Sequence, residues 1–241
     1  RISFKIVFMR KNLILNPQQK AAIEYVTGPL LVLAGAGSGK TRVITQKIVY
    51  LIEQQKVPAK QICAVTFTNK AAQEMNHRLG LAIPALLKKG LTVGTFHNLG
   101  LQFIKKEAKY LNLPRGFSLL DEEDARQLLK GVLPPAIAGD KESVFQILNQ
   151  ISLWKNAMHS VSALLKLYPE QADVIAYYER YQGMLRACQA VDFDDLIVLP
   201  VQLMMQSEEV RLRWQNRWRY LLVDEYQDTN LAQYQLIKHL M

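Results

Sequence analysis

The stretch Leu30-Leu-Val-Leu-Ala-Gly-Ala-Gly-Ser-Gly-Lys-Thr41 decides the fold of this 241-residue chain. Its first five residues, 30–34, form a short apolar run that ends in glycines, a pattern that predicts a buried β-strand. From Thr41 to about Gln54, apolar side chains recur at helical spacing. A glycine-rich turn between a strand and a helix is the context that a phosphate-binding P-loop requires.

The turn carries the groups that hold the phosphates of a nucleotide. Its glycines let backbone N–H groups point at phosphate oxygens, and the following helix adds a favourable dipole. Lys40 can reach the β- and γ-phosphates, and the Thr41 hydroxyl can bind Mg²⁺. The predicted phosphate-binding residues are Ala34, Gly35, Ala36, Gly37, Ser38, Gly39, Lys40 and Thr41. The strict pattern starts with glycine where this chain has Ala34, and the alternative is a glycine-rich turn with an incidental lysine.

A second strand-like run, Arg219-Tyr-Leu-Leu-Val-Asp224, ends in the acids that such a site needs. Asp224 is placed to hold Mg²⁺, directly or through water. Glu225, the next residue, can orient and deprotonate an attacking water. The alternative is a pair of acids that caps the end of a strand.

The rest of the first half also alternates strands with helices. The sequence predicts strands at 62–67 and 91–96, and a helix from Lys70 to about Leu79. Strands that alternate with helices at this pitch form a parallel sheet with right-handed crossovers. From about 99 to 205 the periodicity turns helical, as in 124–133, 144–154 and 175–190, and strand signals vanish. We therefore expect an α/β domain that is interrupted by a helical subdomain.

The charge distribution predicts a polyanionic partner for the first half. The chain carries a net charge of +9, made up of +13 over residues 1–110 and −4 over residues 111–241. A basic half of this kind favours nucleic acid, and the alternative is a set of solvated lysines. Apolar residues make up 49% of the chain, which is enough for a sizeable core and excludes wholesale disorder.

Several other classes of protein are excluded by composition. Cys63 and Cys188 lie far apart, which excludes a disulfide framework and a cysteine-based zinc site and fits a reducing cytosol. The four histidines lack metal-site spacing, and no apolar run is long enough for a membrane span. Lys5 interrupts the apolar start, and no small-residue cleavage site follows it, unlike in a signal peptide. We expect a cytoplasmic protein with no membrane partner.

Five motifs occur in a fixed order along the chain. They are Leu15-Asn-Pro-Gln-Gln19, Ala34-Gly-Ala-Gly-Ser-Gly-Lys-Thr41, Thr66-Phe-Thr-Asn-Lys-Ala-Ala72, Gly94-Thr-Phe-His97 and Asp224-Glu-Tyr-Gln-Asp-Thr-Asn230. Together they resemble the motifs of the Rep-like (UvrD, PcrA and Rep) family of superfamily 1A DNA helicases. The resemblance implies a RecA-like P-loop domain that uses ATP and Mg²⁺ to move 3′ to 5′ along single-stranded DNA.

Three further nucleotide contacts are implied by the resemblance. Gln19 matches the glutamine that reads the adenine edge, although Asn16 and Pro17 also mark a helix start at this point. Arg42 matches an arginine near the base, and its alternative is a solvated helix residue. Gln227 matches the glutamine that senses the γ-phosphate.

The resemblance also implies a single-stranded DNA surface just after two of the strands. The matching residues are Phe67, Thr68, Asn69, Thr95, Phe96 and His97. Aromatic rings beside polar groups fit a groove that combines base stacking with phosphate contacts. The alternative for Phe67 and Phe96 is core packing at strand ends, and His97 is more often a hydrogen-bonded structural histidine.

Other notable residues have structural explanations. The stretch Asp192-Phe-Asp-Asp-Leu196 suggests a metal site, but acids at this position more often begin a helix. Tyr177, Tyr178 and Tyr181 have helical spacing, which favours packing. The pair Trp154-Lys155 suggests DNA contact, and a half-buried tryptophan is the more common explanation.

The family pattern divides the chain into a RecA-like domain 1A at 9–97 and 205–241 and a helical insert 1B at 98–204. Translation is expected to begin at Met9, which makes residues 1–8 a non-essential leader. A second RecA-like domain is expected to be missing, so this chain would bind ATP but hydrolyse it slowly. The rival hypotheses are another P-loop enzyme, such as a small-molecule kinase, and a non-enzymatic module that binds ATP and DNA.

Overall fold

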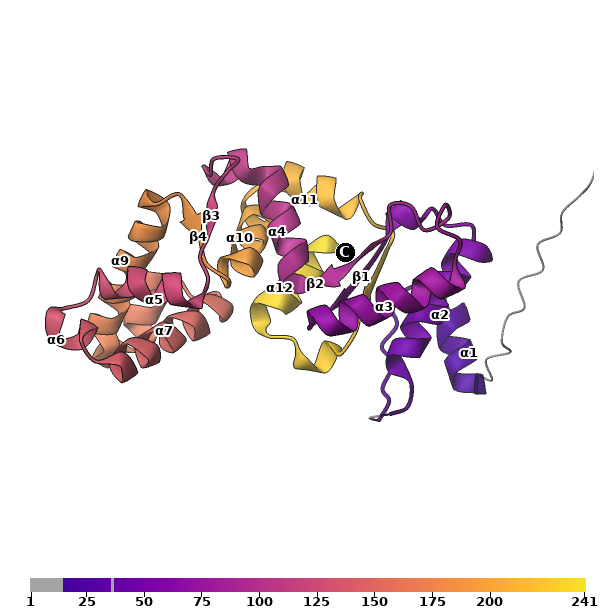
Figure 1. The fold of residues 1–241 in the computed structure, drawn as a ribbon, viewed down its shortest axis with the longest axis horizontal. Coiled ribbons are helices and arrows are strands. Elements are labelled where there is room, and N and C mark those ends of the chain that lie inside the picture. The colour runs from indigo at the N-terminus through magenta and orange to yellow at the C-terminus, as the bar shows by residue number, and fades with distance from the viewer. Residues whose placement is uncertain (1–14, 36) are drawn as a thin grey trace, which may run out of the picture.

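A computed structural model describes residues 15–35 and 37–241. The expected leader at 1–8, the expected start at Met9 and Ala36 of the glycine-rich turn lie outside the described residues. The molecule is elongated, with the sheet and the helices around it towards one end and a group of helices at the other, among them α5(Glu122–Lys130), α6(Pro135–Ala138), α7(Lys141–Asn156) and α9(Ala172–Ala187) (Figure 1). Helices α4 and α10 lie between the two ends.

The main sheet has three parallel strands. They are β1(Ile62–Thr66), β2(Thr92–Thr95) and β5(Tyr220–Val223), in the spatial order β2-β1-β5. Cys63 of the central strand is in register with Thr92 on one side and Leu221 on the other. All five residues of β1 are buried, which is why this strand reads as an unbroken apolar run. The predicted parallel sheet is confirmed.

The strand predicted at residues 30–34 is wrong. These residues have no strand conformation and are not part of the sheet that the described residues form. Leu31 and Leu33 are 65% and 87% exposed. A strand needs a neighbour that completes its ladder of hydrogen bonds, and an apolar run without that neighbour stays irregular.

Helices cover the sheet end of the molecule and continue beyond it. The helices of the first half are α1(Pro17–Glu24), α2(Lys40–Glu53), α3(Asn69–Ala82) and α4(Phe96–Glu107). The later ones are α10(Asp195–Gln206), α11(Glu208–Gln215) and α12(Leu231–Leu240). Short 3₁₀ turns occur at η1(Ala59–Gln61), η2(Ala108–Leu111), η3(Pro169–Gln171) and η4(Tyr226–Asp228). None of the helices within residues 15–35 and 37–241 combines the length and the apolar character that a membrane span needs.

The middle of the chain is helical, as the sequence predicted. Its helices are α5(Glu122–Lys130), α6(Pro135–Ala138), α7(Lys141–Asn156), α8(Val161–Leu167) and α9(Ala172–Ala187), and they share one buried cluster that includes Trp154 and Tyr181. The expectation that strands vanish here needs one correction. β3(Ser118–Leu119) pairs in parallel with β4(Ala190–Val191), and two-residue strands are too short to show any alternation in sequence.

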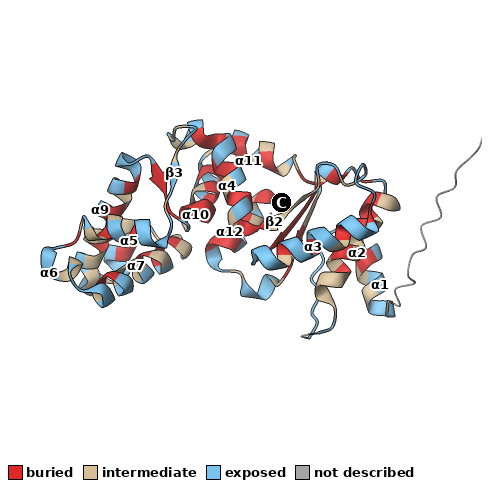
Figure 2. Cartoon of the chain, in the orientation of Figure 1, coloured by how far each residue is buried: buried red, intermediate tan, exposed pale blue. Residues whose placement is uncertain are grey.

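A second buried cluster joins the sheet to the helices at the centre of the molecule. Cys63 and Val65 of β1 pack with residues of α4, α10, α11 and α12, and Phe103 stacks on Trp214 with 4.5 Å between ring centroids. Figure 2 shows buried residues gathered where α4, α10 and α12 meet. At Gly100 a Cβ atom would lie 1.7 Å from the carbonyl oxygen of Leu196, so this glycine permits the close contact of α4 with α10.

Candidate functional site

The candidate site lies where the three parallel strands end. Because the strands are parallel, the carboxyl ends of β1, β2 and β5 meet at one edge of the sheet. α3 starts at Asn69 just after β1, α4 starts directly after β2, and Asp224 follows β5. In parallel α/β sheets, ligands bind at this edge. The fold therefore brings residues of three predicted motifs to one edge, and the hydrogen bond between Thr41 and Asp224 adds the glycine-rich turn.

The glycine-rich turn presents backbone N–H groups at the start of α2. Gly37 and Gly39 have φ angles of 75° and 88°, in the left-handed region that favours glycine. Gly39 is the N-cap of α2 and brings no side-chain acceptor, so the N–H groups of the first turn are not capped by it. The first turn of α2 also contains no acid. Such a helix start favours an anion.

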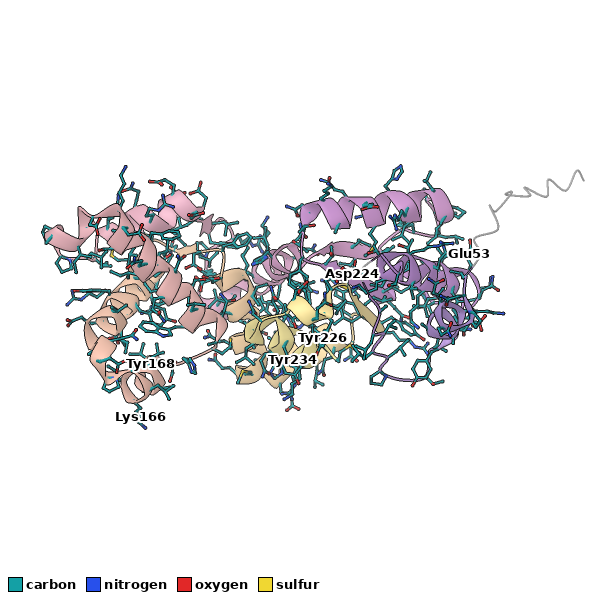
Figure 3. The ribbon with its side chains drawn as sticks, turned by 90° about the horizontal axis from the view of Figure 1, so that it is seen from below. Glu53, Lys166, Tyr168, Asp224, Tyr226 and Tyr234 are labelled. Carbon is teal, nitrogen blue, oxygen red and sulfur yellow. The ribbon has the colours of Figure 1, made fainter. Side chains whose placement is uncertain are left out.

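Asp224 connects the end of β5 to the start of α2. Its backbone N–H donates to the carbonyl oxygen of Val65 at 2.9 Å, which continues the pairing with β1. Its side chain is buried, and Oδ2 accepts a hydrogen bond of 3.0 Å from Oγ1 of Thr41. Oδ1 accepts from the backbone N–H of Glu225 at 3.1 Å. Figure 3 shows Asp224 near the middle of the molecule, beside the segment that carries Tyr226.

Lys40 and Glu225 form the charged part of the same site. Nζ of Lys40 lies 3.4 Å from Oε2 of Glu225 and donates to the carbonyl oxygen of Ala34 at 3.3 Å. Nε2 of Gln227 donates to Oε2 of Glu225 at 2.6 Å. These contacts, first the hydrogen bond from Gln227 and then the charge of Lys40, lower the pKa of Glu225. The carboxylate is therefore ionised and held beside the lysine.

Gln19 serves as both a capping residue and a neighbour of the glycine-rich turn. Asn16 caps α1, and the side chains of Asn16 and Gln19 form a reciprocal capping box. Nε2 of Gln19 also donates to the carbonyl oxygen of Ser38 at 3.1 Å. The predicted helix start is confirmed, and it holds Gln19 against the turn. Arg42 lies in the first turn of α2 and is partly buried.

The six residues predicted to face DNA divide into exposed and buried groups. Thr68 caps α3 and is exposed together with Asn69, while Phe67 is half-buried. Phe96 is 2% exposed and packs edge-on against Phe67, with 5.4 Å between centroids. Thr95 is also buried and caps α4. In this structure the ring of Phe96 is therefore a core residue that supports Phe67, which is the alternative that the sequence left open.

His97 contacts an aromatic residue that the sequence did not single out. Its ring stacks on Phe193, with 3.8 Å between centroids and 21° between planes. Phe193 is 58% exposed, although it is a large apolar residue. Burial lowers the pKa of His97 to about 4, so the imidazole is neutral at pH 7. No local pattern predicts this pairing, because the two residues are far apart in the sequence.

The acids at 192–195 belong to a buried ion cluster. Nζ of Lys155 lies 2.7 Å from Asp192 and 2.6 Å from Asp195, and Tyr181 donates to Asp192 at 3.0 Å. The two carboxylates raise the pKa of Lys155, which is therefore charged. The prediction that these acids begin a helix is confirmed, because α10 starts at Asp195. Lys155 is a buried ion-pair residue, and the sequence did not indicate this.

Comparison with known families agrees with this arrangement. A family model described as the UvrD/REP helicase N-terminal domain matches residues 15–241. The chain belongs to the UvrD/REP helicase family. The match confirms the family resemblance of the ordered motifs, and the parallel sheet is the RecA-like α/β fold that the resemblance implied.

Three curated relatives illustrate the similarity. The chain is 51% identical over 229 residues to the ATP-dependent DNA helicase Rep of Escherichia coli K12, which covers 94% of this chain and 34% of that protein. For Rep of Salmonella typhimurium LT2 the identity is 49%, with the same coverage. For the ATP-dependent DNA helicase PcrA of Bacillus subtilis 168 it is 38% over 232 residues, or 94% of this chain and 31% of that protein. The chain thus spans about a third of the length of these relatives.

Proposed function

We propose that this chain is the ATP- and single-stranded-DNA-binding part of an ATP-dependent DNA helicase that moves 3′ to 5′. The observation that carries the proposal is the convergence of Thr41 and Asp224 across the start of α2 and the end of β5, with Lys40 and Glu225 beside them. A phosphate-binding turn and an acid of this kind are the two parts that P-loop nucleotide hydrolases share. The names of the relatives, which are DNA helicases, support the choice of polymer.

In this proposal the phosphates bind the backbone of residues 34–39 and the side chain of Lys40. The lysine exchanges its contacts with Glu225 and Ala34 for phosphate oxygens. Gln19 contacts the adenine edge from its place beside Ser38, and Arg42 lies near the base. Release of Glu225 from Lys40 frees the carboxylate to orient and deprotonate the attacking water, and Gln227 senses the γ-phosphate.

The oxygen ligands at the site suit Mg²⁺. Mg²⁺ in nucleotide sites is held by one or two carboxylates together with substrate phosphates. The Asp224 carboxylate and the Thr41 hydroxyl would supply the protein's share, and their oxygens are already 3.0 Å apart. When bound, the ion neutralises charge that develops on the phosphates. Asp224 is buried and anchored to Val65, so its carboxylate is held in place for this role.

The DNA face in this proposal combines helix starts with aromatic rings. The first turns of α3 and α4 start at the ends of β1 and β2, and helix N-termini favour phosphate. Thr68 and Asn69 are exposed there, Phe67 is half-buried, and Thr95 and the ring of Phe96 lie beneath them. His97 and the exposed Phe193 extend the surface with a stacked pair of rings on which DNA bases can stack.

We further propose that rapid turnover and strand separation depend on parts of the relatives' length that this chain does not span. In P-loop enzymes an arginine supplied from elsewhere is worth roughly 10³–10⁵-fold in rate. The family resemblance assigns that arginine to a second RecA-like domain. Within this chain, residues 9–97 and 205–241 are proposed to form the ATP-binding domain and residues 98–204 the helical insert.

The test is titration of the chain with labelled oligo-dT and Mg·ATP at several salt concentrations. We expect slow hydrolysis that single-stranded DNA stimulates, and DNA affinity that falls steeply with salt as counterions are released. A small-molecule kinase would not respond to DNA. A non-enzymatic module would bind both ligands without any turnover. Salt-insensitive or sequence-specific binding would contradict the proposed DNA face.

A further inference from the structure

A chain of side-chain hydrogen bonds runs from the segment after Asp224 to the turn that carries Phe193. Nδ2 of Asn230 donates to Oδ1 of Asn156 at 2.8 Å. Nδ2 of Asn156 in turn donates to Oδ1 of Asp194 at 2.7 Å. Asn156 thus uses both its amide oxygen and its amide nitrogen in this series of bonds.

The two residues at the ends of this series of hydrogen bonds, Asn230 and Asp194, belong to the two proposed binding surfaces. Asn230 is the N-cap of α12 and follows the 224–229 segment that holds the acids of the nucleotide site. Asp194 follows Phe193, whose ring stacks on His97. Asn156 is the last residue of α7 and bridges these two positions.

Asn156 lies beside a buried ion cluster and is also hydrogen-bonded within its own helix. Lys155, its neighbour, is buried between Asp192 and Asp195. The amide of Asn156 also donates to the carbonyl oxygen of Ser152 at 2.9 Å, one turn back in α7. The bond between Asn156 and Asp194 is partly buried and the bond between Asn230 and Asn156 is exposed, so these bonds connect a surface N-cap to the buried charged cluster.

We propose that Asn156 is a positioning residue. It couples nucleotide binding at the Lys40–Asp224 site to the affinity for single-stranded DNA at the His97–Phe193 face. This inference rests on the proposed function, because it needs both ligands. When nucleotide binding shifts the 224–230 segment, Asn230 moves Asn156, and Asn156 moves the turn at 192–194. Coupling between sites typically changes affinity by roughly 5–150-fold, and it acts equally in both directions.

The test measures the affinity of the chain for labelled oligo-dT with and without a saturating non-hydrolysable ATP analogue and Mg²⁺. For the natural sequence we expect nucleotide to change DNA affinity by at least about fivefold. In Asn156→Ala that ratio falls to about one, while the affinity for each ligand alone stays within about twofold. Asn149→Ala, an exposed asparagine two turns earlier on α7, is the matched control and keeps the coupling.

A second variant tests the series of hydrogen bonds without truncating Asn156. Asn230→Asp keeps an N-cap acceptor but removes the donor to Asn156, so coupling is lost. Because Asn156 itself is unchanged, this variant stands in if Asn156→Ala fails to fold.

The outcomes separate this inference from the proposed function. A natural chain that binds neither nucleotide nor DNA contradicts the proposed function, and the inference is lost with it. A natural chain that binds both ligands without mutual effect overturns the inference alone. Coupling that survives in Asn156→Ala or in Asn230→Asp overturns it as well.

Discussion

Oγ1 of Thr41 donates a 3.0 Å hydrogen bond to Oδ2 of Asp224, although the two residues are 183 positions apart in the sequence. Thr41 lies in the first turn of α2, and Asp224 is buried at the end of β5. The bond therefore joins the glycine-rich turn to the acid-bearing strand. It places a hydroxyl and a carboxylate where one Mg²⁺ ion can contact both, which makes it the basis of the proposed nucleotide site.

Replacing the Thr41 hydroxyl tests the role of this pair. Thr41→Val keeps the shape of the side chain and removes the oxygen, so Mg²⁺-dependent nucleotide affinity should fall roughly 10–100-fold, as is usual when a metal site is disturbed. Thr41→Ser keeps the oxygen and should stay close to the natural chain. The measurement is nucleotide affinity as a function of Mg²⁺ concentration. Equal Mg²⁺ dependence in the Val and Ser variants would count against metal binding at Thr41.

Glu225→Gln tests the proposed base. Glutamine is close to glutamate in size but cannot accept the proton of an attacking water, so turnover should fall by about 10²–10⁴-fold. Nucleotide binding should remain, because Lys40 and the glycine-rich turn are untouched. The measurement is ATP hydrolysis with saturating single-stranded DNA, alongside nucleotide affinity. Glu74→Gln on the surface of α3 is the control, and undiminished turnover in Glu225→Gln would exclude the assigned role.

The half-buried imidazole of His97 predicts a pH dependence of stability. Burial lowers its pKa from 6.5 to about 4, so between these values the unfolded chain binds more protons than the folded chain. The contribution of His97 is complete above pH 6.5 and is lost as the pH falls towards 4. His97→Gln should therefore flatten urea unfolding midpoints over this interval. The exposed His77→Gln is the control, and an equally steep profile in both variants would refute the assignment.

Gly100→Ala tests the close contact between α4 and α10. A Cβ atom at this position would lie 1.7 Å from the carbonyl oxygen of Leu196, so the two helices must separate. Overpacking of this kind costs about 1–3 kcal/mol or more. Gly116→Ala is the control, because nothing lies within 4 Å of a Cβ atom there. Thermal unfolding should separate the two variants clearly, and equal Tm values would show that α4 and α10 can separate at little cost.

Helices and the strands β1 and β2 could be predicted because their signals are local. The apolar spacing after Thr41 predicted α2, and the runs at 62–67 and 91–96 predicted β1 and β2 within a residue or two. The same local logic failed at 30–34. An apolar run shows that a segment favours burial, but it does not show that a neighbouring strand is available to pair with it.

Contacts between segments that are distant in the sequence could not be predicted from local patterns. The Lys155–Asp192 pair spans 37 positions, and the pattern around each residue fits a helix end equally well. The stack of His97 on Phe193 likewise depends on how α4 and α10 pack. Both pairs follow from tertiary packing, which side-chain periodicity along one element does not report.

The domain limits at 97/98 and 204/205 stay a prediction. One buried cluster holds Cys63 of β1 together with Phe103 of α4 and Val201 of α10, which lie inside the predicted insert. A separate cluster holds α5, α7 and α9. Motif positions in a sequence mark where a pattern changes, whereas a core is defined by which faces pack together. Limited proteolysis would show which grouping behaves as a unit.

The central claim is that Lys40, Thr41, Asp224 and Glu225 form one Mg·ATP site. Calorimetric titration of Mg·ATP into the natural chain and into Lys40→Ala tests it most directly, with the exposed Lys238→Ala as control and circular dichroism to confirm folding. Loss of Lys40 removes a charge-assisted contact to phosphate. The account predicts single-site binding for the natural chain and Lys238→Ala, and no measurable binding for a folded Lys40→Ala. Unchanged ATP affinity in Lys40→Ala would contradict it.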